Sequence, residues 1–224
     1  MEYCKHGTLD DVLHTIRNGA HKYQIEPATT LKWMRQVAAG LGFLHAKRVC
    51  HRDLKSSNVL VDKQKECQIC DYGVSKLMDL STTSSGVEKA SASPTQPGTT
   101  DYMPPEALGA TPDGSMPQEE LPFALDVYSY GVLLNEMASR RRPWHEIPAS
   151  AGKHYAIINR VVHECERPQL VPHLEPAFQG LLEECWAKSP GSRPRFDGDG
   201  GIIERLGALS RYQAAPEPEP ESAD

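Results

Sequence analysis

The sequence has no long hydrophobic run. Hydrophobic residues make up 39 % of its 224 positions, yet no stretch approaches the ~18 consecutive apolar residues of a membrane-spanning helix. Asn135 and Glu136 interrupt even the apolar stretch at 131–138. The first residues, Met1 to His6, also lack the apolar core of a signal peptide. We therefore expect a globular, cytoplasmic protein with no membrane contact.

Basic residues are not in excess. Lys and Arg total 24 against 30 Asp and Glu, and four of the six surplus acids lie within residues 214–224. A protein that binds along nucleic acid needs a basic surface to neutralise phosphates. The near-neutral remainder of the chain therefore predicts no nucleic-acid partner.

Cysteines are few and scattered. Of the six, only Cys67 and Cys70 are close enough in sequence to suggest a metal site. A structural zinc site would need two further ligands at matching spacing, and none is present. We expect reduced, buried thiols in a short strand, and no disulfide scaffold.

Apolar spacing predicts a mainly α fold. Apolar residues recur every three or four positions in several segments, which is typical of helices with one buried face. The first helix should begin at a capping box, Thr8-x-x-Asp11, and end at Asn18-Gly19. The other predicted helices span 30–48, 124–138, 154–164, 174–187 and about 202–210.

A β-hairpin and two irregular segments complete the prediction. The apolar run Val59–Val61 and a second run ending at Cys70 flank the polar turn 62–65, as in a hairpin. Residues 78–100 are rich in Ser, Thr, Pro and Gly and should form a long loop. Residues 211–224, an acidic Pro-rich tail, should be disordered and leave one domain at 1–210.

Polar residues with the chemistry for phosphoryl transfer lie around this hairpin. The sequence His-Arg-Asp-Leu-Lys-Ser-Ser-Asn occupies 51–58, and Asp71-Tyr72-Gly73 follows the hairpin. A hairpin would bring Asp71 back beside Asn58, where their oxygens suit Mg²⁺. Asp53 could accept the proton of an attacking hydroxyl, and Lys55 could neutralise a γ-phosphate. A His-Arg-Asp run alone is more often a charged turn, but the added Asn and Asp-x-Gly favour catalysis.

These motifs resemble the carboxy-terminal lobe of a eukaryotic protein kinase. The resemblance covers about residues 1–210 and rests on five patterns in the family's order and spacing. They are the catalytic loop at 51–58, the metal-binding motif at 71–73, the end of an activation segment at 98–106, a buried central helix at 126–131, and the segment from Cys185-Trp186 to Arg193-Pro194.

The resemblance implies an ATP site and several structural roles. Glu2 and Cys4 match the hinge that hydrogen-bonds adenine, with Met1 at the gatekeeper position. Asp11 would lie near the ribose, and Leu60 would be the apolar floor beneath the base. Two further expectations concern the interior: Asp126 would accept hydrogen bonds from the catalytic-loop backbone, and Glu106 would pair with Arg193.

The resemblance also implies the acceptor and a form of regulation. Lys55 and Thr99 resemble the residues at the same motif positions in serine/threonine kinases. The sequence motifs around them are similar to those of the tyrosine-kinase-like group. The partners implied are ATP, a protein substrate and an upstream activating kinase. Arg52 would bind a phosphate on the activation segment. The candidate acceptors there are Ser81, Thr82, Thr83, Ser84, Ser85, Ser91, Ser93 and Thr95.

One part of the kinase pattern is missing from the sequence. The family carries a Gly-rich loop, a strand lysine and a helix glutamate before the hinge, and no Gly-x-Gly-x-x-Gly occurs here. We therefore expect the carboxy-terminal lobe without an amino-terminal lobe, and poor phosphoryl transfer by this chain alone. The alternative is a catalytically inactive, kinase-like scaffold, against which the complete set Asp53, Lys55, Asn58 and Asp71 argues.

Overall fold

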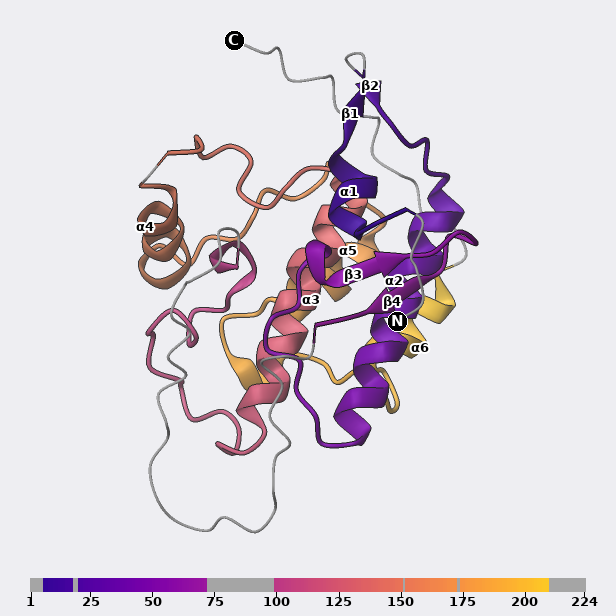
Figure 1. Ribbon diagram of the computed structural model, residues 1–224. Coiled ribbons are helices and arrows are strands. Elements are labelled where there is room, and N and C mark those ends of the chain that lie inside the picture. The colour runs from indigo at the N-terminus through magenta and orange to yellow at the C-terminus, as the bar shows by residue number, and fades with distance from the viewer. Residues whose placement is uncertain (1–5, 18–19, 72–98, 151, 173, 210–224) are drawn as a thin grey trace.

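A computed structural model describes residues 6–17, 20–71, 99–150, 152–172 and 174–209. Within these ranges the chain is mainly helical, with two small antiparallel hairpins, which confirms the predicted fold class (Figure 1). The α-helices are α1 (Leu9–His14), α2 (Pro27–Ala46), α3 (Leu121–Ser139), α4 (Lys153–Ile158), α5 (Pro176–Cys185) and α6 (Ile202–Ala208). The strands are β1 (Ile16–Arg17), β2 (Ala20–His21), β3 (Val59–Val61) and β4 (Cys67–Ile69).

Helix α3 forms the centre of the main hydrophobic core. Its sequence is apolar on nearly all sides, as a helix enclosed by others requires, and it packs against α2 and α5. Tyr130, on α3, is fully buried and donates its hydroxyl to the carbonyl of Met34 on α2 at 2.7 Å. The helix predicted at 124–138 is therefore present, with an extra turn at its start.

Helix α2 connects the core to the carboxy-terminal helix. It begins with Pro27, which suits the first turn because the missing N–H would have no partner there. Arg35 donates to the carbonyls of Leu206 and Leu209 at 3.0 and 2.8 Å, which satisfies groups at the end of α6. The predicted helices at 30–48 and 202–210 thus agree with the structure.

Helix α1 is shorter than predicted. The capping box is present, since Thr8 Oγ1 accepts from the Asp11 N–H at 3.1 Å and the Asp11 carboxylate accepts from the Thr8 N–H at 2.9 Å. The helix ends at His14, however, and Ile16 pairs with His21 in the hairpin β1–β2. Thr15 and Ile16 are β-branched and favour extended backbone. Asn-Gly is also a typical hairpin dipeptide, so reading it as a helix end was wrong; Asn18 and Gly19 themselves lie outside the described residues.

The hairpin β3–β4 matches the prediction. Val59 pairs with Ile69 and Val61 with Cys67. The Asp62 carboxylate closes the turn by accepting from the N–H groups of Gln64 and Glu66, both at 2.8 Å. The segment before α1 lies alongside β3, because Val61 N–H donates to the Gly7 carbonyl at 2.9 Å and Leu60 bridges to Thr8.

A second, smaller hydrophobic cluster lies apart from the main core. It consists of Trp144, Ile147, Ile157 and Val161, and it includes residues of α4 and of the π-helical turn Asn159–His163. Figure 1 shows α4 to one side of α2, α3 and α5. The helix predicted at 154–164 is therefore a short α-helix continued by this wider turn.

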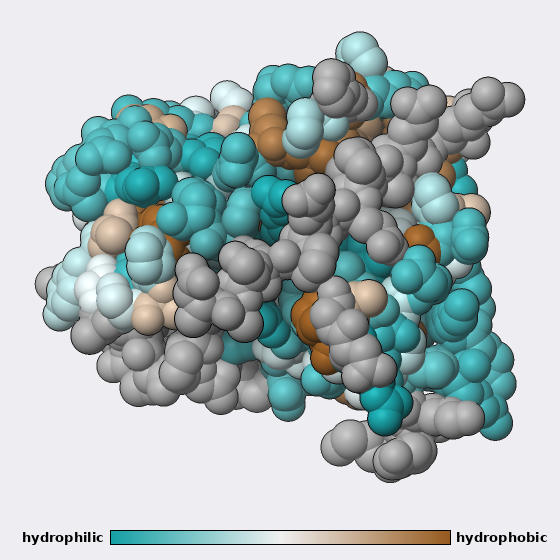
Figure 2. Space-filling model, turned by 90° about the horizontal axis from the view of Figure 1, so that it is seen from above, coloured by the Kyte–Doolittle hydropathy of each residue, from teal (hydrophilic) through white to brown (hydrophobic). Residues whose placement is uncertain are grey.

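The described surface is polar between small apolar patches. On the face shown in Figure 2, hydrophobic residues form separate patches among hydrophilic ones. Among the described residues, no helix has both the length and the hydropathy needed to cross a membrane. Cys67 and Cys70 are free thiols, as expected, but both are half-buried, so their predicted burial was wrong. Burial raises the pKa of the Cys50 thiol to about 12, which keeps that thiol protonated at neutral pH.

Most of the predicted loop at 78–100 and all of the tail at 211–224 lie outside the described residues.

Candidate active site

The loop after α2 is held in place by a buried carboxylate on α3. Asp126 is 1 % exposed and accepts from the backbone N–H groups of His51 and Arg52, at 2.8 and 2.7 Å. Its Oδ2 also lies 2.9 Å from His45 Nε2. These contacts confirm the expected bonds from the loop backbone to Asp126. Arg52 has a φ of 67°, a left-handed conformation that residues other than glycine adopt uncommonly and that recurs at active sites.

Three of the predicted site residues lie together in this loop. Lys55 Nζ is 3.1 Å from Asp53 Oδ2. Asn58 donates from Nδ2 to the carbonyl oxygen and to Oδ2 of Asp53, at 2.7 and 3.0 Å. Lys55 and Asn58 are buried, whereas the Asp53 side chain remains 19 % exposed. The carboxylate is therefore fixed in orientation and still reachable from outside.

Lys55 also reaches a distant part of the chain. Its Nζ donates to Thr99 Oγ1 at 2.9 Å. The ammonium group therefore connects Asp53 with the start of the short helical turn η3 (Thr100–Tyr102). Because Lys55 contacts both residues, the loop that begins at Thr99 lies beside the Asp53 carboxylate.

The hairpin returns the chain to the same place. After β4, the Cys70 N–H donates to the Asn58 carbonyl at 2.9 Å, and the Cys70 carbonyl lies 3.0 Å from His51 Nε2. Asp71 follows directly, exposed and with a φ of 60°. The backbone thus comes back beside Asn58, as the hairpin argument required. Tyr72 and Gly73 lie outside the described residues.

The residues predicted to bind the nucleotide are only partly described. Leu60 lies half-buried on β3, where it bridges to Thr8. Asp11 is exposed at the start of α1, and its Oδ2 is engaged in the capping box. Met1, Glu2 and Cys4 lie outside the described residues. The Asp11 carboxylate, which was expected near the ribose, therefore also serves as part of the cap of α1.

The predicted interior ion pair is present. Arg193 donates from its second terminal nitrogen to the Glu106 carboxylate at 3.0 Å, and both side chains are at most 4 % exposed. Arg193 also donates to the carbonyls of Ala124 and Ala187, each at 3.0 Å. A single guanidinium therefore joins the segment after η3 to α3 and to the end of α5.

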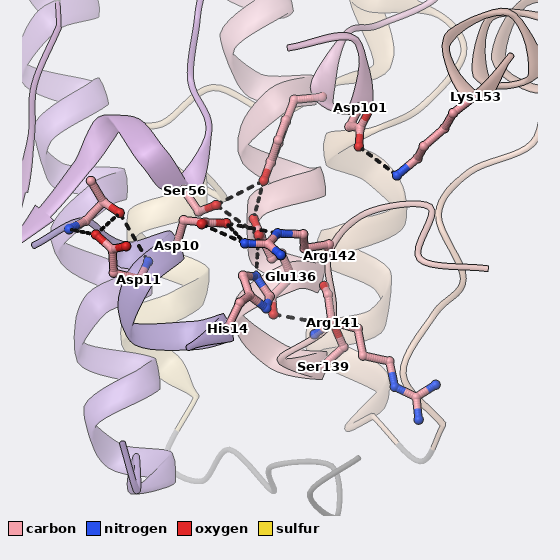
Figure 3. A network of polar contacts seen from close by, with 12 residues as sticks. Asp10, Asp11, His14, Ser56, Asp101, Glu136, Ser139, Arg141, Arg142 and Lys153 are labelled. Carbon is pink, nitrogen blue, oxygen red and sulfur yellow. Dashed lines mark hydrogen bonds and ion pairs between the residues drawn. The ribbon is translucent and has the colours of Figure 1, made fainter. Parts of the chain in front are cut away.

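A second buried carboxylate, Glu136, is 1 % exposed on α3 and was not predicted from the sequence. It accepts from Tyr102 at 2.6 Å and from Ser56 at 2.9 Å, and it lies 2.8 Å from His14 Nε2 (Figure 3). Burial and the neighbouring carboxylate raise the pKa of Tyr102 well above its usual value, so its hydroxyl remains a donor. The only signal for this role was that Glu136 interrupts an apolar run.

The neighbouring Asp10 completes this polar network. Asp10, His14 and Glu136 bring ligand atoms within 4.8 Å of one another. Arg142 already pairs with Asp10 at 2.8 Å, and its guanidinium supplies the positive charge there. The network therefore joins α1, the catalytic loop, η3 and α3 through hydrogen bonds and ion pairs.

Comparison with known proteins identifies the family. The model of the protein kinase domain matches residues 1–198. The Arabidopsis thaliana serine/threonine-protein kinase CTR1 is 34 % identical over 198 residues, which cover 87 % of this chain and 21 % of that protein. The human mitogen-activated protein kinase kinase kinase 7 is 32 % identical over 217 residues, which cover 95 % of this chain and 31 % of that protein.

The chain thus spans between a fifth and a third of the length of these two relatives. The match extends from the residues before α1 to those beyond Arg193, and so includes the whole of the site described above. The chain therefore belongs to the protein kinase family.

Proposed function

We propose that the site transfers the γ-phosphoryl group of ATP to serine or threonine hydroxyls of a protein substrate. The observation that carries this proposal is the contact of Lys55 with both Asp53 and Thr99, at 3.1 and 2.9 Å. A carboxylate and a cation are then fixed beside a loop that can receive an acceptor. Phosphoryl transfer depends mostly on such positioning and on neutralisation of charge.

The proposed roles follow from the donors and acceptors of each side chain. Asp53 is partly exposed and accepts the proton of the substrate hydroxyl as its oxygen attacks phosphorus. Lys55 carries a positive charge that stabilises the transferred group and also fixes the orientation of Asp53. In these roles both side chains would touch the reacting groups, so we propose them as the catalytic pair.

Asn58 and Asp71 suit a magnesium ion by their chemistry. The amide nitrogen of Asn58 is already used, since it donates twice to Asp53, and this leaves Oδ1 as the atom for a metal. Asp71 is exposed and follows Cys70, whose N–H donates to the Asn58 carbonyl, so it supplies a carboxylate on the returning strand end. Mg²⁺ prefers such oxygen ligands together with nucleotide phosphates, whose charge it would neutralise when bound.

The remaining nucleotide contacts are proposed from the family resemblance. Glu2 and Cys4 would hydrogen-bond adenine, Leu60 would lie beneath the base and Asp11 near the ribose. We propose that residues 1–210 form the lobe that binds the metal and the protein substrate, because this part is mainly helical and contains both motifs. We also propose that the protein acts in the cytoplasm.

Arg52 supports regulation by phosphorylation. Its Nε is buried and has no hydrogen-bond partner among the described residues, and an unpaired buried donor costs free energy. A phosphate on the segment before Thr99 would supply the missing acceptor. We propose that an upstream kinase adds it, at one of the serines or threonines between 81 and 95.

Binding of Mg-ATP tests the proposed site directly. Mg-ATP should raise the melting temperature of the full-length protein, by an amount equivalent to about 2.7 kcal/mol at a concentration of 100 Kd. Asp71→Asn should remove most of this rise, because Asn tolerates a positive φ but carries no charge. Thermal denaturation with and without EDTA measures both effects.

The control for this experiment is Asp199→Asn, which removes an exposed charge in the turn before α6. It should retain the full rise. An equal rise in Asp71→Asn and the unsubstituted protein would contradict the metal role. No rise in either would contradict ATP binding, and would favour the inactive scaffold.

A further inference from the structure

Four consecutive residues at the start of η3 are each held by a different side chain. Thr99 accepts from Lys55, and Tyr102 donates to Glu136. Between them, Thr100 shares a hydrogen bond with His154 and Asp101 pairs with Lys153. The outer two contacts come from the catalytic loop and α3, whereas the inner two come from α4. The segment 99–102 is therefore held from two sides.

Both contacts made by α4 lie within hydrogen-bonding distance and are partly shielded from water. His154 Nδ1 lies 2.6 Å from Thr100 Oγ1. Lys153 Nζ lies 3.3 Å from Asp101 Oδ2 (Figure 3). The side chains of Lys153 and Asp101 are 24 % and 17 % exposed. An ion pair at this depth is screened less by water than one on the open surface.

Asp101 depends on this lysine electrostatically. Burial raises the pKa of the Asp101 carboxyl, and the charge and hydrogen bond of Lys153 act against that rise. Without Lys153, the ionised carboxylate would remain partly buried and would lose the cation that opposes the effect of burial. The loop would then shift to expose Asp101 to water, because burial of an unpaired charge is costly.

The two polar contacts of α4 connect the small hydrophobic cluster to η3. The apolar side of α4 packs in the small cluster with Trp144, Ile147 and Val161, not in the main core. Lys153 and His154 lie at its amino-terminal end, against η3. Two polar pairs therefore connect the small cluster to the segment that Lys55 holds beside Asp53.

We propose that Lys153 and His154 are positioning residues that set the distance between Asp53 and the loop 99–102, which receives the acceptor polypeptide. This inference rests on the proposed function. Neither residue touches the reacting atoms; both act through Thr100 and Asp101. Loss of either contact should weaken productive binding of the protein acceptor and leave ATP binding unchanged.

The test combines steady-state kinetics with amide hydrogen exchange in the full-length protein, with dephosphorylated casein as the acceptor. Lys153→Ala should raise KM for casein by about tenfold, the factor expected for loss of a charge-assisted hydrogen bond. KM for ATP should stay within about twofold of its original value. Exchange should accelerate in peptides covering 99–106. His154→Ala should act in the same direction, and Lys153→Arg should restore KM.

Two further variants separate positioning from general destabilisation. The exchange of charges in Lys153→Asp with Asp101→Lys should restore KM, whereas each single substitution raises it. Arg160→Ala is the matched control, since Arg160 follows α4 and pairs with Glu146 and Glu166 but not with η3. It should leave both KM and exchange at 99–106 unchanged.

The possible failures are distinguishable. If the unsubstituted protein transfers no phosphate, the proposed function is contradicted. Hydrogen exchange still tests whether the contacts of α4 stabilise the loop 99–102. If transfer occurs but Lys153→Ala has the original KM for casein, or raises it no more than Arg160→Ala, the positioning role is wrong. Unchanged exchange at 99–106 in Lys153→Ala would overturn it independently.

Discussion

Asp53→Asn should lower kcat by about 10²- to 10⁴-fold, the usual contribution of a positioned general base. The asparagine can still accept from Asn58 and contact Lys55, so the loop should keep its shape. It cannot take up the proton of the acceptor hydroxyl. KM for ATP should change little, because the nucleotide is proposed to bind through other residues. Steady-state transfer from labelled ATP to casein measures kcat, and single-turnover transfer shows whether the chemical step is the one that slows.

A matched substitution separates loss of the base from loss of a charge. Asp199→Asn removes the same charge from an exposed position far along the chain and should leave kcat unchanged. Thermal denaturation should show that Asp53→Asn is folded. A kcat within about threefold of the unsubstituted value would exclude Asp53 as the base.

Arg193→Ala should lower the free energy of unfolding by about 3–5 kcal/mol, the typical cost of leaving a buried charge without its partner. The Glu106 carboxylate would stay buried beside an empty space. Two carbonyl groups, of Ala124 and Ala187, would also lose their donor. Urea denaturation followed by circular dichroism measures this loss.

The control for this prediction is a surface ion pair. Arg205 pairs with Glu184, and their side chains are 28 % and 50 % exposed. Arg205→Ala should therefore cost no more than about 1 kcal/mol. If both arginine variants lose the same small amount, the Arg193–Glu106 pair does not hold the interior together.

Local patterns predicted most of the elements and part of the site. The periodicity of α2 and α3 and the polar turn between β3 and β4 are encoded within short windows of sequence. The catalytic loop could be predicted because Asp53, Lys55 and Asn58 lie within six positions of one another. The end of α1 was missed because Asn-Gly is typical of both a helix terminus and a hairpin.

Contacts between distant segments could not be predicted in the same way. Glu136 meets Ser56 and His14 across 80 and 122 positions, and no local pattern specifies such a meeting. Lys153 and Asp101 are 52 positions apart and come together only when α4 packs against η3. The family resemblance predicted the pairing of Glu106 with Arg193, but it predicted no contacts for residues to which its motifs assign no role.

The separate small cluster has a consequence for how this protein can diverge from its relatives. Because Trp144, Ile147, Ile157 and Val161 pack among themselves, mutations that reshape the outer side of α4 need not be compensated by changes in α2 or α3. Tyr155, 74 % exposed on that helix, can vary at little energetic cost. The outer side of α4 is therefore free to vary during evolution, whereas Lys153 and His154 at its start are constrained by their contacts with η3.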